Sequence, residues 1–138
     1  MPLPARRYWQ GTYWASLDPQ AKPVLTRTDP VLNFSYRGDL PLGDQERSRV
    51  EWRGTLHIIQ GGHYGFVPVS TGNNQVELRI DGKKVAIANQ EAGVLLKPGD
   101  HPAVVKLLKQ GGFVDAFHLA WRPPGRERYE ILPPEALR

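Results

Sequence analysis

The residues best suited to ligand chemistry lie in one polar segment, Thr71-Gly72-Asn73-Asn74-Gln75. The side-chain amides of Asn73 and Asn74 each offer a donor and an acceptor, which is what paired sugar hydroxyls require, and Thr71 and Gln75 add further polar groups. A second interpretation stays open, because asparagine tolerates left-handed backbone conformations and is common in turns. The segment is therefore predicted to be either a binding loop or a plain turn.

Aromatic residues gather near the N-terminus, where Tyr8, Trp9, Tyr13 and Trp14 follow one another closely. An exposed flat ring can stack on a sugar face, and aromatic side chains also anchor protein interfaces. Residues of this kind also close the end of a β-sandwich core. We therefore take Trp9 and Trp14 as candidate ligand-binding residues, with a structural role as the alternative.

Catalytic and metal-binding patterns are missing from the sequence. The four histidines have no metal-ligand spacing, and the chain has no cysteine. No nucleophile elbow, phosphate-binding glycine loop or dinucleotide fingerprint occurs. An enzyme would require two carboxylates, or a histidine and a carboxylate, that converge in a pocket, and no spacing in the sequence places two carboxylates together. The sequence predicts a protein that is not an enzyme and has no metal site.

The composition limits the remaining classes. A chain of 138 residues makes one domain, and the absence of cysteine excludes a disulfide framework. The net charge of +4 is spread over separate segments, which is unlike the gathered charge of nucleic-acid binders. No apolar stretch approaches the roughly 20 residues of a membrane span. We expect one domain over 1–138, with residues 1–7 and 133–138 as boundary or linker, and neither nucleic-acid binding nor a transmembrane segment.

Hydrophobic residues alternate with polar ones almost everywhere, which is the period of half-buried β-strands. Trp52 and Trp121 fall on the apolar faces of their strands and are predicted to lie in the core. Pro68 cannot donate to a ladder, so we expect an open edge or a bulge there. Three hairpins are predicted, at Gln60-Gly61-Gly62 between strands 49–59 and 63–70, at Asp81-Gly82 between 76–80 and 83–88, and at Gln110-Gly111-Gly112 between 102–109 and 113–122.

Upstream, shorter strands are expected over 11–15 and 31–36, separated by a polar loop with prolines. The segment 89–95 is also expected to be a loop. No stretch of 10 or more residues shows a helical period. Hairpins at this spacing predict an all-β protein built as an antiparallel two-sheet β-sandwich or barrel.

Several motifs in this order resemble the protective-antigen-fourteen (PA-fourteen) domain family, and the resemblance covers nearly the whole chain. Each motif alone is common among β proteins, whereas the ordered set is far more specific. The motifs are Gly11-Thr12-Tyr13-Trp14, Arg27-Thr28-Asp29-Pro30, Trp52-Arg53-Gly54, Gly62-His63-Tyr64-Gly65-Phe66, Ile80-Asp81-Gly82, Leu119-Ala120-Trp121-Arg122-Pro123-Pro124-Gly125 and Ile131-Leu132-Pro133-Pro134-Glu135-Ala136-Leu137.

The resemblance implies a lectin-like sandwich of jelly-roll type that binds carbohydrate as part of a larger protein. In the sugar-binding adhesins of this family, two adjacent aspartates before the Ile-Asp-Gly strand hold a calcium ion that ligates sugar hydroxyls. Asn73 and Asn74 occupy the matching positions here. Because calcium affinity rises with the number of carboxylate ligands, these two amides predict a greatly weakened calcium site, and we expect no cofactor.

Together these observations predict a non-catalytic carbohydrate-binding accessory module of an extracytoplasmic protein, at the cell surface, in the periplasm or secreted. Its ligand would be a glycan held by the segment from Thr71 to Gln75 and by an exposed aromatic ring. The alternative is a structural domain that packs against the catalytic domain of its parent, such as a membrane glycosyltransferase or a glycosidase. Exposure of Trp9 and Trp14 separates the two expectations.

Overall fold

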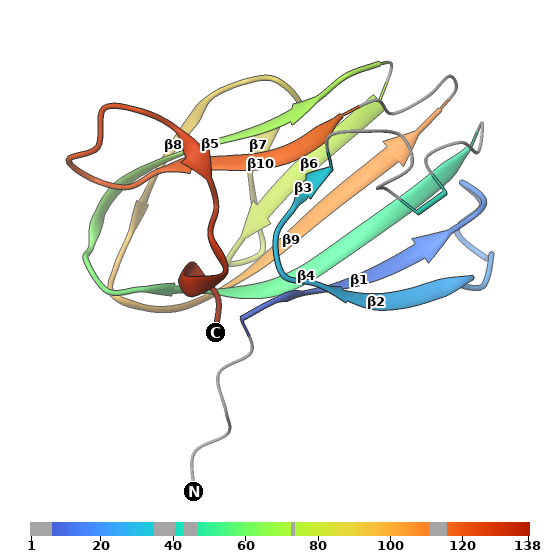
Figure 1. Cartoon of the computed structure of the whole chain (residues 1–138), viewed down its shortest axis with the longest axis horizontal. Coiled ribbons are helices and arrows are strands. Elements are labelled where there is room, and N and C mark those ends of the chain that lie inside the picture. The colour runs from blue at the N-terminus through green and yellow to red at the C-terminus, as the bar shows by residue number, and fades with distance from the viewer. Residues whose placement is uncertain (1–6, 35–40, 43–46, 73, 111–115) are drawn as a thin grey trace, which may run out of the picture.

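The computed structural model describes residues 7–34, 41–42, 47–72, 74–110 and 116–138. The chain forms two antiparallel sheets that face each other across a core (Figure 1), as the sequence predicts. The first sheet has six strands in the order β2-β1-β4-β9-β6-β7, namely β2 (Leu25–Asp29), β1 (Trp9–Trp14), β4 (Ser48–Ile58), β9 (Gly99–Lys109), β6 (Asn74–Ile80) and β7 (Lys83–Ile87). The second has the order β11-β10-β5-β8, namely β11 (Glu130–Ile131), β10 (Phe117–Arg122), β5 (Gly62–Ser70) and β8 (Ala92–Leu96), with β3 (Asn33–Phe34) paired to β10.

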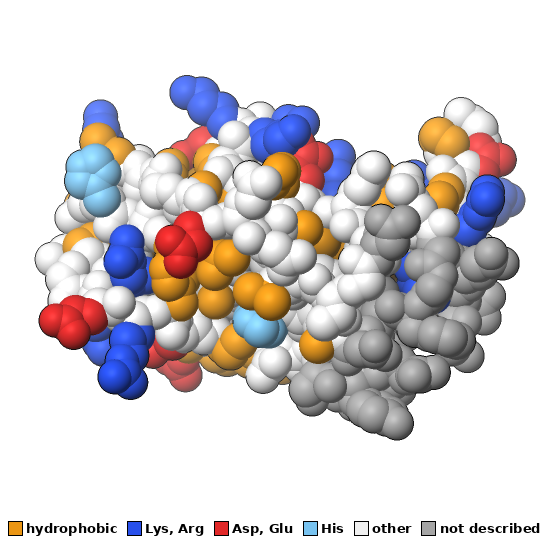
Figure 2. Space-filling model, turned by 90° about the horizontal axis from the view of Figure 1, so that it is seen from above, with side chains coloured by type: hydrophobic (Ala, Val, Ile, Leu, Met, Phe, Trp, Pro, Cys, Tyr) orange, Lys and Arg blue, Asp and Glu red, His pale blue; other side chains and the backbone are white. Residues whose placement is uncertain are grey.

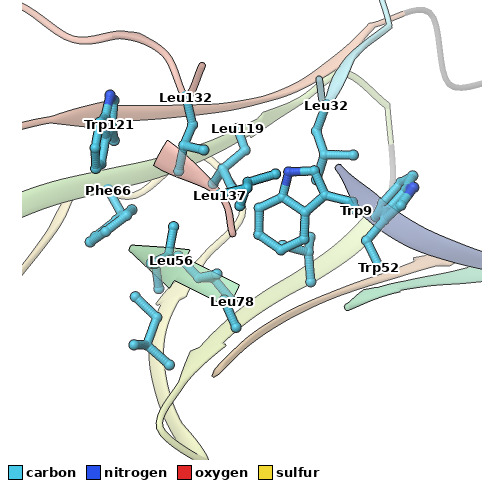
Figure 3. Close-up of a cluster of buried hydrophobic side chains, with 14 of the residues drawn as sticks. Trp9, Leu32, Trp52, Leu56, Phe66, Leu78, Leu119, Trp121, Leu132 and Leu137 are labelled. Carbon is cyan, nitrogen blue, oxygen red and sulfur yellow. The ribbon is translucent and has the colours of Figure 1, made fainter. Parts of the chain in front are cut away.

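The core lies between the two sheets and is built from alternate residues of each strand. Trp52 is fully buried and lies between the rings of Phe34 and Phe117, with centroids at 5.8 and 5.2 Å. Trp9 packs directly over Gly54, where a Cβ atom would come within 2.9 Å of the indole ring. Leucines from both sheets fill the remaining space (Figure 3). The core predicted at Trp52 and Trp121 is therefore confirmed.

Two of the predicted hairpins are wrong. β4 pairs with β1 and β9, whereas β5 pairs with β10 and β8 in the other sheet, so the chain crosses between sheets at residues 59–61. The predicted hairpin at 110–112 fails in the same way, because β9 and β10 belong to different sheets. Gly111 and Gly112 lie outside the described residues. Alternation shows that each strand has one buried face, but strands of both sheets share that property, so alternation does not identify the partner strand.

Two edge strands were predicted to be loops. β2 pairs with β1, with Leu25 opposite Tyr13 at one end and Asp29 opposite Trp9 at the other, and β8 pairs with β5. Both strands are short and partly exposed, and three of the five residues of β2 (Leu25, Thr26 and Thr28) are open to solvent. An edge strand buries little, so its sequence lacks the alternation that marks a central strand.

The turn at Asp81-Gly82 is confirmed. Asp81 has φ 55° and Gly82 has φ 80°, and Ile80 pairs with Lys83 across the turn. Positive φ at both central residues is the type I′ pattern, in which the second position favours glycine. The open edge expected at Pro68 is also present, because β8 pairs with β5 only as far as Phe66.

The C-terminal segment 133–138, expected to be boundary or linker, packs onto β4. A short 3-10 helix, η1 (Pro134–Ala136), places Leu137 against β4, where its backbone bridges to Leu56. Leu132, Ala136 and Leu137 are buried, and the amide of Arg138 donates to the carbonyl of Thr55 at 2.9 Å. The helix lies at the rim between the sheets, so this tail closes the core.

The start of β1 and the C-terminus lie at the end of the strands opposite the Thr71 segment. Tyr8, Thr55 and Arg138 line one shallow depression. Asn74 instead pairs with Lys109, which pairs with Ser48. Ser48 and Thr55 are seven residues apart along β4, which is about 23 Å. Within the described ranges, no helix is long and apolar enough to cross a membrane.

Candidate functional site

The segment between β5 and β6 is held by its own polar side chains. The Thr71 hydroxyl accepts from the amide of Ala116 at 2.9 Å, and the Asn74 amide nitrogen donates to the carbonyl of Thr71 at 2.6 Å. The left-handed position is Gly72, with φ 82°, so Asn74 supports the turn through its side chain. Asn73 lies outside the described residues. Thr71 and Asn74 are therefore partly committed to shaping the turn.

Asn89 supports this segment from the neighbouring connection between β7 and β8. It accepts from the amide of Ser70 at 3.0 Å, donates to the carbonyl of Ser70 at 2.9 Å, and has φ 62°. Its own amide donates to the carbonyl of Pro68 at 2.6 Å. Asn89 thus takes the place of a partner strand where the pairing of β8 with β5 has ended. The preference of asparagine for left-handed positions was the only sign of this role in the sequence.

The side-chain oxygens that the structure describes at Asn74 and Asn89 are neutral amide oxygens. The Asn74 Oδ1 atom is buried and has no hydrogen-bond partner among the described residues, but it is a single neutral oxygen. Both amide atoms of Asn89 are used by Ser70. In the described part of the chain, no group of three or more His, Cys, Asp or Glu side chains is arranged to hold a metal. Calcium sites take six to eight oxygens with several carboxylates among them.

A groove of about 380 Å³ starts at Asn74 and follows the outer face of the six-stranded sheet. Strand register explains its composition, because Gln75 stands opposite Leu108 and Glu77 opposite Lys106. Leu108, Ile87 and Ala88 supply an apolar floor, while Gln75, Glu77, Lys84 and Lys106 supply polar groups along it. Glu77 also pairs with Arg79 at 3.0 Å. Of the residues predicted from the sequence, Asn74 and Gln75 line this groove, and the other lining residues are brought together only by the pairing of β6 with β9 and β7.

Trp14 lies on this same outer face. Register places Trp14 opposite Arg49, Arg49 opposite Leu108, and Leu108 opposite Gln75, so one row crosses four strands. Three strand spacings separate Trp14 from Gln75, which is about 14 Å. The Arg49 guanidinium lies 4.3 Å from the Trp14 ring centroid, a cation–π contact that orders both side chains.

The expectation of an exposed ring at Trp9 is wrong. Its side chain is 1% exposed and packs over Gly54, so it offers no face to a ligand. Strand alternation is the reason, because Trp9 and Tyr13 share the inward face of β1 whereas Trp14 points outward. Of the two candidate tryptophans, only Trp14 stands on a surface.

A separate polar cluster joins two turns at the other end of the strands. His101 places Nδ1 at 2.7 Å from the Asp81 carboxylate and Nε2 at 2.7 Å from the carbonyl of Lys97. Both partners are acceptors, so both ring nitrogens must donate, and only the imidazolium form does so. The hydrogen bond to Asp81, and then the one to Lys97, raise the pKa of His101 above its usual value.

We expect this cluster to make stability depend on pH. Because the folded-state pKa of His101 is raised, its contribution is fully present below about pH 6.5, the unfolded value, and is lost as the pH rises through the folded pKa. His118 acts in the opposite sense, since burial lowers its pKa. Urea midpoints of the wild type and of His101→Gln, measured from about pH 5 to about pH 9, should differ most at low pH. Parallel curves would contradict this role of His101.

Comparison with known proteins supports the architecture. No family model and no curated protein matches this sequence. A solved anti-sigma factor domain-containing protein has a TM-score of 0.81 at 20% identity, over 99% of this chain and 49% of its own. The PA14 domain of the antifreeze protein MpAFP has a TM-score of 0.74 at 14% identity, and the match covers 99% of this chain and 93% of that one. The PA14 sugar-binding domain from an RTX adhesin has a TM-score of 0.69 at 17% identity, and the match covers 94% of this chain and 97% of that one.

The fold is therefore that of a PA14-like two-sheet sandwich, as the ordered motifs of the sequence indicate. At these identities the likeness concerns the fold. The chain spans about half the length of the anti-sigma factor domain-containing protein that it matches.

Proposed function

We propose that this domain is a non-catalytic carbohydrate-binding module of a larger extracytoplasmic protein. The observation that carries the proposal is the groove on the six-stranded sheet, because it begins at Asn74 and combines an apolar floor with polar groups of both kinds. The glycan lies along this groove, with one end at the turn from Thr71 to Asn74. The sugar-binding PA14 domain of an RTX adhesin has the same fold, which agrees with this class of ligand.

The chemistry of the groove suits sugars. A sugar ring has a face of C–H groups, which Leu108 and Ile87 can contact, and a rim of hydroxyls that both donate and accept. Lys84 and Lys106 donate, Glu77 accepts, and Gln75 does both. The row from Gln75 to Trp14 extends the surface, so a longer glycan could reach the indole ring beside Arg49.

Binding to a glycan array, comparing the wild type with Gln75→Ala and Gln10→Ala, tests the groove. Gln10 is the matched control, because it is an exposed glutamine on the outer face of the same sheet but outside the groove. Loss of one net hydrogen bond should lower affinity roughly five- to tenfold for Gln75→Ala. Gln10→Ala should bind as the wild type does. Equal binding by all three proteins would contradict the groove as the binding site.

We propose that recognition does not need calcium. With neutral oxygens at the turn, adding calcium should change neither the melting temperature nor glycan binding, whereas a ligand that binds only the folded state would raise the melting temperature. Thermal melts and array binding with calcium and with a chelator measure both effects. Binding that disappears on chelation would show that the turn still holds an ion.

A second candidate function is an interaction domain that packs against its parent protein, such as a glycosyltransferase or a glycosidase. The observation that favours it is a patch of hydrophobic side chains on the outer face of the five-stranded sheet (Figure 2). Val67, Val69 and Ile131 are partly exposed there, and register places Val67 and Ile131 on either side of the buried Ala120 and Val69 beside His118. An array that shows no binding with calcium or with chelator, together with protection of Val67 and Val69 amides from hydrogen exchange in the parent protein only, would favour this function.

A further inference from the structure

A second hollow lies on the opposite side of the molecule from the groove, on the outer face of the five-stranded sheet. Gly65 of β5 and Gly93 of β8 stand directly opposite each other, so two neighbouring outward positions lack side chains. The resulting hollow has a volume of about 250 Å³ and a floor of backbone. Its open half is at Gly93, where an added Cβ would meet no atom closer than 4.0 Å.

The other half of the hollow is covered by one aromatic ring. Tyr129, from the connection between β10 and β11, lies so close over Gly65 that a Cβ there would come within 3.0 Å of its Cζ atom. The Arg122 guanidinium lies 5.3 Å from the centroid of the Tyr129 ring, which holds the ring in place. The close approach of Tyr129 thus explains why position 65 is a glycine. No side chain covers Gly93, so that half of the floor is open.

Charged groups of both signs surround the open half. His63, Glu91 and Arg122 line the hollow, and none of them forms an ion pair with another described residue. Figure 2 shows side chains of both signs beside the hydrophobic patch on this face. Arg122 only donates and Glu91 only accepts, so the pair offers both halves of the hydrogen bonding that a hydroxyl needs, with no net charge.

We propose that this hollow is a second saccharide subsite that takes one neutral pyranose unit. The flat glycine floor admits a sugar ring at close range, the edge of Tyr129 borders it, and Arg122 and Glu91 bind its hydroxyls. The volume is below the range of about 300–1,000 Å³ typical of sites for drug-sized ligands, which suits a single sugar unit. The subsite depends on the proposed function only for the class of ligand, since no residue is shared with the groove.

The test is a nuclear magnetic resonance titration of the domain with the methyl pyranosides of glucose, galactose, mannose and N-acetylglucosamine. Binding should shift the amide signals of Gly93, Gly65 and Tyr129. Gly93→Val fills the open half, and its backbone is not in the left-handed region, so the fold should be kept. The control is Leu95→Val, which changes an exposed residue of the same strand outside the hollow.

We expect Gly93→Val to lower affinity at the hollow at least tenfold and Leu95→Val to leave it unchanged. Gln75→Ala should also leave it unchanged, because Gln75 lies in the groove. Shifts at Gly93 without shifts at Gln75 would support the subsite and contradict the groove. Shifts confined to the groove, no response of the Gly93 amide to any of the four pyranosides, or full binding by Gly93→Val would overturn the subsite.

Discussion

Replacing Asp29 by alanine should destabilise the domain by about 3–5 kcal/mol, the range expected when one partner of a buried charged network is removed. Asp29 is 4% exposed, and its Oδ2 atom accepts from the Tyr13 hydroxyl at 2.6 Å and from the Trp52 indole nitrogen at 3.0 Å. The Arg27 Nε atom lies 2.7 Å from the Asp29 Oδ1 atom and forms an ion pair with it. The Nε–H bond does not point at this oxygen, so the contact is not a hydrogen bond.

The cost is large because two buried donors would lose their acceptor. Burial, and then the hydrogen bond to Asp29, raise the pKa of Tyr13, so its hydroxyl stays protonated and must donate. The indole N–H of Trp52 has no acceptor function, and the remaining contact to the Tyr13 oxygen is 3.2 Å long. Each unsatisfied buried donor costs about 1–3 kcal/mol.

Urea unfolding followed by tryptophan fluorescence measures the effect, since Trp52 reports directly on the network. Asp18→Ala is the matched control, because the Asp18 carboxylate is exposed and, among the described residues, accepts only from the amide of Gln20 within a loop. The control should stay within about 0.5 kcal/mol of the wild type. An Asp29→Ala protein that loses less than about 1 kcal/mol would show that the network contributes little to folding.

Leu137→Ala should cost about 2–5 kcal/mol, the range for truncating a buried leucine. Leu137 is 2% exposed and lies among core side chains of both sheets, close to the end of the chain (Figure 3). The effect would be unexpected for a linker, which is how the sequence was interpreted.

Chemical denaturation of Leu137→Ala and of Leu95→Ala separates packing from residue type. Leu95 is 63% exposed, so the same substitution there should change the free energy of unfolding by less than about 0.5 kcal/mol. If both variants unfold at the same denaturant concentration, the C-terminal segment does not close the core in solution.

Most strand positions followed from the sequence, and most strand partners did not. The alternation over β4, β6 and β10 is clear because each of these strands has one face in the core. The Asp81-Gly82 turn was predicted correctly because positive φ at two successive residues has a strong residue preference. The crossings after β4 and β9 were missed because glycine allows a hairpin and a change of sheet equally well.

The candidate site shows the same division. Asn74 and Gln75 were identified by residue type, and both line the groove. Lys106 and Leu108 are equally part of it, but they lie more than 30 positions along the chain and look like ordinary outward strand residues. Trp9 was predicted as a ligand-binding residue because an aromatic cluster in the sequence does not reveal which ring points inward. In the structure Trp9 is buried and Trp14 lies on the surface.

The sequence by itself determined the all-β class, the type I′ turn and the burial of Trp52. These follow from residue type and from local periodicity, which act over a few positions. Only the tertiary structure decided which strands share a sheet, which side chains line the groove and the hollow, and that Asp29 is buried. Those features depend on register between strands that are distant in the chain, where packing of the whole core selects one pairing.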